Sequence, residues 1–133
     1  MSARGFANPN DLLYYGGPVM SNVQVVVVFW TSGVDSTEQS NAAPFYTTMT
    51  ASPWMDILSE YYTAGRNGQD TLPGSNQIIG QGSYVGSYTI TPSVCGAGGS
   101  CTIDDSQIGP EIARQIANGH LPQPQYDGSG DPN

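Results

Sequence analysis

Two adjacent carboxylates, Asp104 and Asp105, fit acid–base chemistry better than any other pair in this chain. They follow a predicted strand and begin a predicted helix, and active sites in open α/β sheets form at such strand-to-helix junctions. Two neighbouring carboxyl groups can share a proton, so that one donates and the other accepts in an acid peptidase or a glycosidase. An Asp at a helix N-terminus also accepts hydrogen bonds from free backbone N–H groups. The sequence therefore leaves two interpretations open, a catalytic pair and a helix cap.

A second group of oxygen-bearing side chains lies near the C-terminus, at the alternate positions Asp127, Ser129 and Asp131. Calcium loops place their ligands at alternate positions in this way. The segment lacks the glutamate that closes such loops, and Gly-rich tails often have a similar composition. Calcium is the one cofactor that the sequence suggests, and the alternative is a tail that binds nothing.

Aromatic side chains are a third candidate, because they are abundant in a chain in which only 11% of the residues are charged. Exposed Tyr and Trp next to Asn, Gln and Ser suit sugar or peptide ligands, since their rings combine an apolar face with a polar group. We expect Tyr14, Tyr15 and Trp54 to form such a binding surface. The alternative is that these rings fill the core.

Serine-based catalysis and zinc chemistry are not predicted. The chain has one histidine, His120, and no Gly-x-Ser-x-Gly motif. His120 follows Gly119, which is expected to end a helix, so it is interpreted as a loop residue. With one histidine and two cysteines, a zinc site lacks ligands.

The charge balance argues against two classes of partner. Three basic residues stand against eleven acidic ones, which gives a net charge of −8. Nucleic acids and anionic membranes bind basic surfaces, so neither is an expected partner. The longest apolar run is far shorter than the ~18 residues of a membrane span, so we predict no membrane insertion. An acidic, charge-poor surface is typical of secreted proteins that meet polysaccharide or peptide.

The only cysteines, Cys95 and Cys101, enclose a loop of Gly, Ala and Ser. Such a loop lets the two sulfur atoms meet, and we predict a disulfide rather than free thiols. A structural disulfide indicates an oxidising compartment, and hence an extracellular location. Because the first residues carry no apolar leader, the chain is interpreted as a mature domain cut from a longer precursor.

The length of 133 residues predicts one domain. It divides into an N-terminal arm over 1–13, a folded part over 14–121 and a Pro/Gly-rich tail over 122–133. The apolar run 23–30 is predicted to be a strand buried on both faces. Residues 77–91 are predicted to form one strand, or two strands broken by glycines.

Three helices are expected between and after these strands. The first begins at Ser36 or Thr37 and is kinked or divided at Pro44. The second is capped by Ser52, and its spacing predicts one apolar stripe, made of Trp54, Ile57, Leu58, Tyr61 and Tyr62. The third begins at the carboxylate pair and ends at Gly119.

The order strand, helix, helix, strand, helix predicts an α/β fold with a mostly parallel sheet and flanking helices. A third strand is expected after the last helix, yet the chain stops at Asn133. Either the tail forms an irregular edge, or the domain is a fragment of a longer one. In a fragment, an open strand edge would favour pairing with a second chain or with the missing C-terminal segment.

Four short segments give the chain a family resemblance. Gly16-Gly17-Pro18-Val19 follows two tyrosines and precedes the Val-rich strand, and the other segments are 52–61, 80–84 and 103–108. Over about residues 12–125 they resemble the exordium or phosphate-induced protein family of plant cell walls, and more closely its secreted bacterial relatives. The resemblance implies an extracellular or wall-associated protein of poorly defined biochemistry. The family usually has histidine where this chain has Tyr15, and it continues with another strand and a Cys/His-containing segment.

We therefore expect a secreted, exordium-like binding or interaction module, with carbohydrate as one candidate ligand. The first alternative is an acid-active hydrolase, a peptidase or a glycosidase, that uses Asp104 and Asp105. The second is a structural subunit of an extracellular assembly. A hydrolase needs converging carboxylates in a concave site, a binding module needs exposed aromatic side chains, and a structural subunit forms oligomers.

Overall fold

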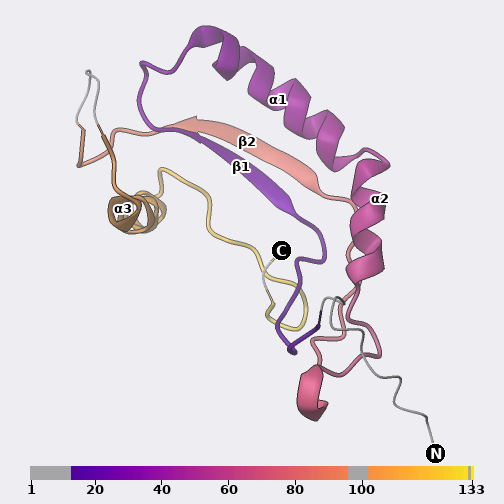
Figure 1. Ribbon diagram of the computed structural model, residues 1–133. Coiled ribbons are helices and arrows are strands. Elements are labelled where there is room, and N and C mark those ends of the chain that lie inside the picture. The colour runs from indigo at the N-terminus through magenta and orange to yellow at the C-terminus, as the bar shows by residue number, and fades with distance from the viewer. Residues whose placement is uncertain (1–12, 96–101, 132) are drawn as a thin grey trace, which may run out of the picture.

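The computed structural model describes residues 13–95, 102–131 and 133 (Figure 1). Along the chain it contains β1 (Gln24–Phe29), α1 (Ser36–Thr50), α2 (Trp54–Leu58), β2 (Ser83–Thr89) and α3 (Asp105–Ala117). Two short 3₁₀ turns lie between α2 and β2, at Ser59–Tyr61 and Gln69–Thr71. The predicted order of elements and the α/β fold are confirmed.

The sheet of the described residues has two strands, and they are parallel. Gln24 pairs with Ser83 and Phe29 with Thr89, with one irregularity between Val25 and Val26. Parallel strands need a long crossover, which α1 and α2 provide. Gly82 comes just before β2 and lies against Val23. Glycine is needed at this position, because a Cβ would collide with Val23.

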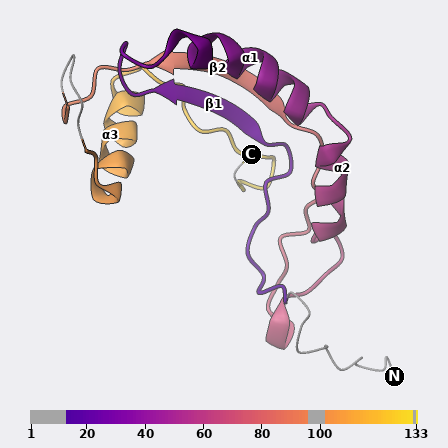
Figure 2. The same ribbon diagram turned by 45° about the horizontal axis from the view of Figure 1, so that its top comes forward.

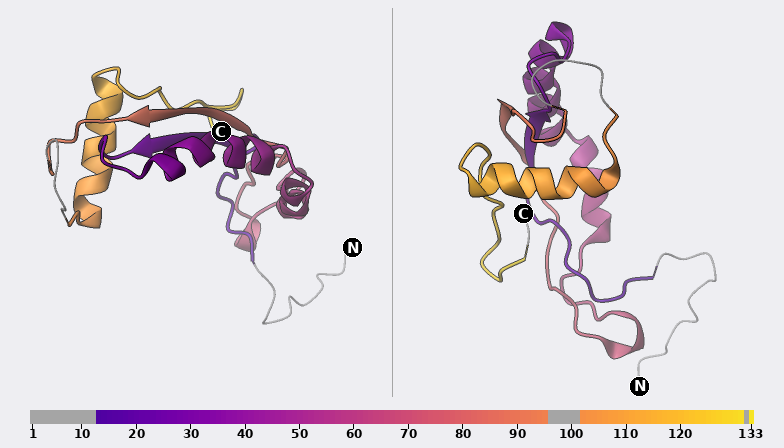
Figure 3. Two further views of the ribbon diagram at one scale, coloured as in Figure 1. Left: turned by 90° about the horizontal axis from the view of Figure 1, so that it is seen from above. Right: turned by 90° about the vertical axis from the view of Figure 1, so that its left-hand side faces the viewer.

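β1 was predicted to be buried on both faces, and this expectation is wrong. Its six residues are all half-buried, although five of them are valine or phenylalanine. The reason is that β1 has one neighbouring strand in the described chain, while α1 covers one face and α3 lies at the carboxyl end of the strands (Figures 1 and 2). Figure 3 shows that α3 runs across the strands rather than along them.

α1 differs from the prediction at its start, and of the two alternatives at its proline it excludes the divided helix. Its N-cap is Asp35, one residue before the predicted positions, and the Asp35 side chain accepts a hydrogen bond from Thr37 N at 2.8 Å. Asp is among the strongest N-cap residues. Pro44 lies within α1 without dividing it, so one helix spans Ser36–Thr50.

α2 begins at Trp54, and Ser52 does not cap it. The Ser52 hydroxyl instead donates a hydrogen bond to the carbonyl of Met49 at 2.7 Å. The predicted apolar stripe stays largely exposed, and Met55, which lies outside the stripe, is the buried residue of this helix. Four large side chains of this stripe are exposed: Trp54, Ile57, Tyr61 and Tyr62.

Few apolar side chains are fully buried. Among the described residues these are Met55, Ile90 and Leu121. α3 ends as predicted, because Gly119 follows its last turn with a φ of 75° that favours glycine. The residues of α3 that are buried are polar, Glu111 and Gln115.

Candidate functional site

Asp104 is the N-cap of α3. Its Oδ1 accepts hydrogen bonds from the backbone N–H and the hydroxyl of Ser106, both at 3.2 Å. The Gln107 side chain in turn accepts from Asp104 N at 2.9 Å, which completes a capping box. Asp105 is the first residue of the helix, and both aspartates are exposed. The capping interpretation therefore describes Asp104, and a catalytic role for the pair stays a prediction.

Asp127 closes a turn in the tail. Its Oδ1 accepts hydrogen bonds from Ser129 N at 2.8 Å and Asp131 N at 3.0 Å, and its Oδ2 accepts from Gln77 Nε2 at 3.1 Å. The backbone N–H groups of Asp131 and Ser129 lower the pKa of Asp127. Within residues 13–95, 102–131 and 133, no group of three His, Cys, Asp or Glu side chains could hold a metal ion. Calcium binding stays a prediction.

The three aromatic candidates divide into one structural residue and two exposed ones. The Tyr14 hydroxyl donates to the carbonyl of Gly17 at 2.8 Å and accepts from Ser75 N at 2.9 Å. Tyr14 therefore ties two distant loops together. Tyr15 is 67% exposed and Trp54 is 58% exposed, so these two rings are available to a ligand.

Trp54 belongs to an apolar pocket between α2 and the first half of β1. We call it the α2 pocket, and its volume is about 350 Å³. Every described residue in its wall is aliphatic, aromatic or methionine: Met20, Val23, Val25, Met49, Trp54, Met55, Leu58, Tyr61 and Ile79. Three of the chain's four methionines lie here. Methionine is flexible and polarisable, so such a wall can adapt to different apolar groups.

The mouth of the α2 pocket lies in an exposed apolar surface. Met20, Trp54 and Tyr61 are each more than half exposed, and so is the neighbouring Ile57. Large contiguous apolar surfaces on soluble proteins mark interaction sites more often than scattered apolar residues do. Sequence periodicity predicts that Trp54, Ile57 and Tyr61 share one helix face, but it does not show that they stay exposed.

A second pocket, of about 400 Å³, lies on the opposite face of β1. We call it the α3 pocket, because α3 and the segment after it form its wall together with alternate residues of β1. Its lining mixes apolar and amide side chains: Gln24, Val26, Val28, Ile112, Ile116, Leu121, Pro122, Gln123, Pro124, Gln125 and Asn133. The two pockets thus flank a single strand.

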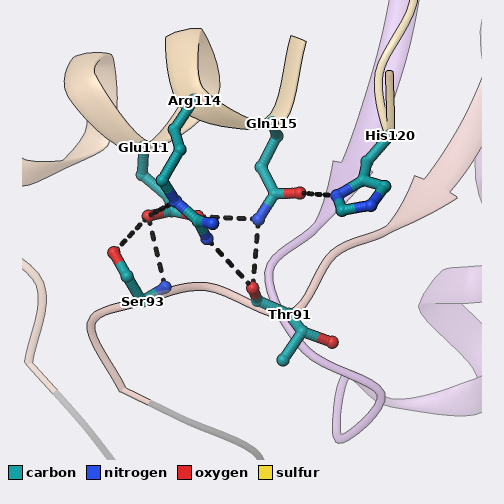
Figure 4. Close-up of polar contacts among 6 residues, drawn as sticks. All are labelled: Thr91, Ser93, Glu111, Arg114, Gln115 and His120. Atoms are coloured by element: carbon teal, nitrogen blue, oxygen red, sulfur yellow. Dashed lines mark hydrogen bonds and ion pairs between the residues drawn. The ribbon is translucent and has the colours of Figure 1, made fainter. Parts of the chain in front are cut away.

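A buried polar cluster on α3 was not foreseen from the sequence (Figure 4). Glu111 is 3% exposed, and its carboxylate accepts from the hydroxyl and backbone N–H of Ser93, from the Arg114 guanidinium and from Gln115 Nε2. Arg114, and after it Ser93, hold the pKa of Glu111 far below its usual range. Because the carboxylate is saturated with donors, Glu111 is a poor general base. It clamps α3 to the segment after β2.

The same cluster sets the orientation of His120. Gln115 Nε2 donates to Glu111 Oε1 at 2.7 Å and to the carbonyl of Thr91 at 3.0 Å, which uses both of its hydrogens. Gln115 Oε1 therefore accepts from His120 Nδ1 at 2.7 Å, and the neutral ring carries its proton on Nδ1. The one sequence signal for this cluster is the i, i+3, i+4 spacing of Glu111, Arg114 and Gln115.

The comparisons with known protein families, curated proteins and solved structures found no match. The resemblance to the exordium family therefore stays a prediction from short motifs. The predicted disulfide involves Cys101, and the predicted arm involves residues 1–12, all of which lie outside the described residues. In the described part of the chain, no helix is long and apolar enough to span a bilayer.

Proposed function

We propose that this chain is an extracellular binding module that holds an apolar segment of a partner polypeptide in the α2 pocket. The observation that carries the proposal is the wall of that pocket, which is apolar throughout while Trp54 and Tyr61 stand more than half exposed at it. An extracellular location rests on the charge-poor composition, the predicted disulfide and the motif resemblance.

A polypeptide fits the α2 pocket better than a carbohydrate does. Each sugar hydroxyl that leaves water needs a hydrogen-bond partner. Among the described side chains of this wall, only Trp54 and Tyr61 carry an N–H or O–H group. Apolar peptide side chains need no such partner and gain free energy from burial, at about 25 cal/mol per Å² of apolar surface.

The charge of the chain narrows the ligand further. A net charge of −8 repels acidic peptides and attracts basic ones. Of the basic residues in the described chain, Arg114 pairs with Glu111, and Arg66 lies over the Tyr62 ring at 4.7 Å from its centroid. We therefore expect the preferred ligand to combine apolar side chains with Lys or Arg.

The hydrolase hypothesis has less support from the geometry. A catalytic carboxylate must be free to give or take a proton in a concave site. Asp104 is exposed and caps α3, and Glu111 is buried and saturated with donors. Among the described residues, no Asp or Glu side chain lines either pocket.

The test is a calorimetric titration of the protein with two sets of ligands. One set is basic apolar peptides, and the other is neutral oligosaccharides. We expect peptide binding that weakens at least tenfold in Trp54→Ala. Phe45→Ala is the matched control, because Phe45 is 59% exposed, against 58% for Trp54, and does not line the α2 pocket. Binding of oligosaccharides alone, or equal losses in both variants, would contradict the proposal.

A further inference from the structure

β1 has an edge that nothing in the described chain pairs with. The carbonyl of Val23 accepts a hydrogen bond from Ser83 N, at the start of β2, at 2.8 Å, and that of Phe29 accepts from Ile90 N, just after β2, at 3.0 Å. Along a strand, successive residues direct their backbone groups to opposite edges. Gln24, Val26 and Val28 therefore direct theirs away from β2. No hydrogen bond from the rest of the described chain reaches these groups.

The two pockets lie on opposite faces of this strand. Val23 and Val25 line the α2 pocket, while Gln24, Val26 and Val28 line the α3 pocket. Neither pocket is lined by a residue of β2, Ser83–Thr89. Both pockets therefore lie along β1, on the side of its open edge. This arrangement explains why β1 stays half-buried despite its valines.

We propose that the partner polypeptide binds as an added strand along the open edge of β1, with alternate side chains entering the α2 pocket and the α3 pocket. An extended strand directs successive side chains to opposite faces, so one added strand addresses both pockets at once. Its backbone also satisfies the open groups of Gln24, Val26 and Val28. This inference rests on the proposed function and specifies how the partner is recognised.

The geometry defines the chemistry of the partner strand. β1 has six residues, so an added strand of similar length spans about 20 Å. Side chains that enter the α2 pocket must be apolar, because its wall is apolar throughout. Those that enter the α3 pocket can be apolar or uncharged polar, because Gln24, Gln123 and Gln125 contribute amides there.

The net negative charge favours a strand from a different, basic polypeptide over a strand from a second copy of this chain. Each copy has a net charge of −8, so two copies repel one another, whereas Lys or Arg beside the strand would be attracted. The outer edge of β2 is also unpaired within the described chain, but no residue of β2 lines either pocket. Four residues of β2 are exposed, and three of these are hydroxyl-bearing: Ser83, Ser87 and Thr89.

The probe is a peptide with about six core residues that alternate valine with threonine, flanked by lysines. Single N-methyl groups are placed at each core position in turn, since they remove one backbone donor and leave the side chain intact. We expect N-methylation at alternate positions to weaken binding at least tenfold. At the positions in between, we expect changes below about threefold, because those N–H groups face away from β1.

The outcomes separate this inference from the proposed function. Binding that needs Trp54 but shows no alternation with N-methylation overturns the added strand and leaves the α2 pocket as the site. Absence of binding by every basic apolar peptide overturns both. Self-association of the wild-type chain at the concentrations used for the titration, seen by light scattering and suppressing peptide binding, identifies a second copy as the occupant and overturns the foreign strand.

Discussion

Because Asp104 caps α3, its replacement is predicted to lower the stability of the folded chain. Asp104 accepts two hydrogen bonds from Ser106, and its own N–H donates to Gln107 Oε1 at 2.9 Å. Replacing Asp104 with alanine removes the side-chain acceptor from the first turn of α3. Loss of such a cap costs about 1 kcal/mol of unfolding free energy. For a domain of this size, that lowers the melting temperature by about 4 °C.

Asp104→Asn is the matched control, because asparagine is as good an N-cap as aspartate. We expect thermal and urea unfolding to show a loss in Asp104→Ala, and stability close to wild type in Asp104→Asn. Asp105→Ala should lose at most about 0.5 kcal/mol, the contribution of one exposed acidic residue near a helix N-terminus. Equal stability of wild type and Asp104→Ala would refute the capping account. Hydrolysis abolished in Asp104→Asn, with stability unchanged, would restore the catalytic pair.

Three further substitutions test the contacts by which Glu111 clamps α3 to the segment after β2, the packing beside the α2 pocket, and the end of α3. The pKa of Glu111 is lowered in the folded chain, so its contribution to stability is present above the ordinary value of 4.5 and is lost as the pH falls below it. Urea unfolding across acidic pH should therefore show a steeper loss in wild type than in Glu111→Gln, and parallel curves would contradict the clamp. Met55 is 4% exposed, and Met55→Ala should destabilise the fold by about 2–4 kcal/mol in the same assay; a loss below about 1 kcal/mol would show that the site is not packed. Gly119 has a φ of 75°, so Gly119→Ala should cost about 1 kcal/mol, and a neutral effect would show that α3 ends differently.

Local signals predicted the elements and their order. The valine run, the aspartate pair at the start of α3 and Gly119 at its end each act through neighbours in sequence. Such effects can be read from a short window. The same window misplaced the cap of α1 by one residue, because Asp35, Ser36 and Thr37 are all good caps and propensity alone does not choose among them.

The exposure of side chains could not be predicted in the same way. The stripe on α2 has the spacing of a core-facing helix, yet Trp54, Ile57 and Tyr61 are exposed. Periodicity shows which residues share a face, but only the arrangement of the other elements shows what covers that face. For the same reason, the half-burial of β1 became visible only once its single neighbouring strand was known.

The polar cluster on α3 was missed for a different reason. Glu111 and Ser93 are 18 positions apart in the sequence, and Thr91 and Gln115 are 24 apart. Isolated polar residues at such separations carry no signal of contact, and Glu is rarely buried unless it is paired. The aspartate pair therefore predicted a site at the exposed N-terminus of α3, whereas the buried polar contacts of this helix lie two turns further along.

The most direct test of the central claim is a titration of the protein with the peptide, in which NMR records the methyl signals of its labelled methionines. Met20, Met49 and Met55 all line the α2 pocket, so their methyl signals report occupancy from inside the site. We predict that the valine–threonine peptide shifts all three signals along one binding curve, and that Trp54→Ala weakens the curve while Phe45→Ala does not. Peptide binding that leaves the three signals unchanged would contradict the account, because the ligand would then occupy another surface.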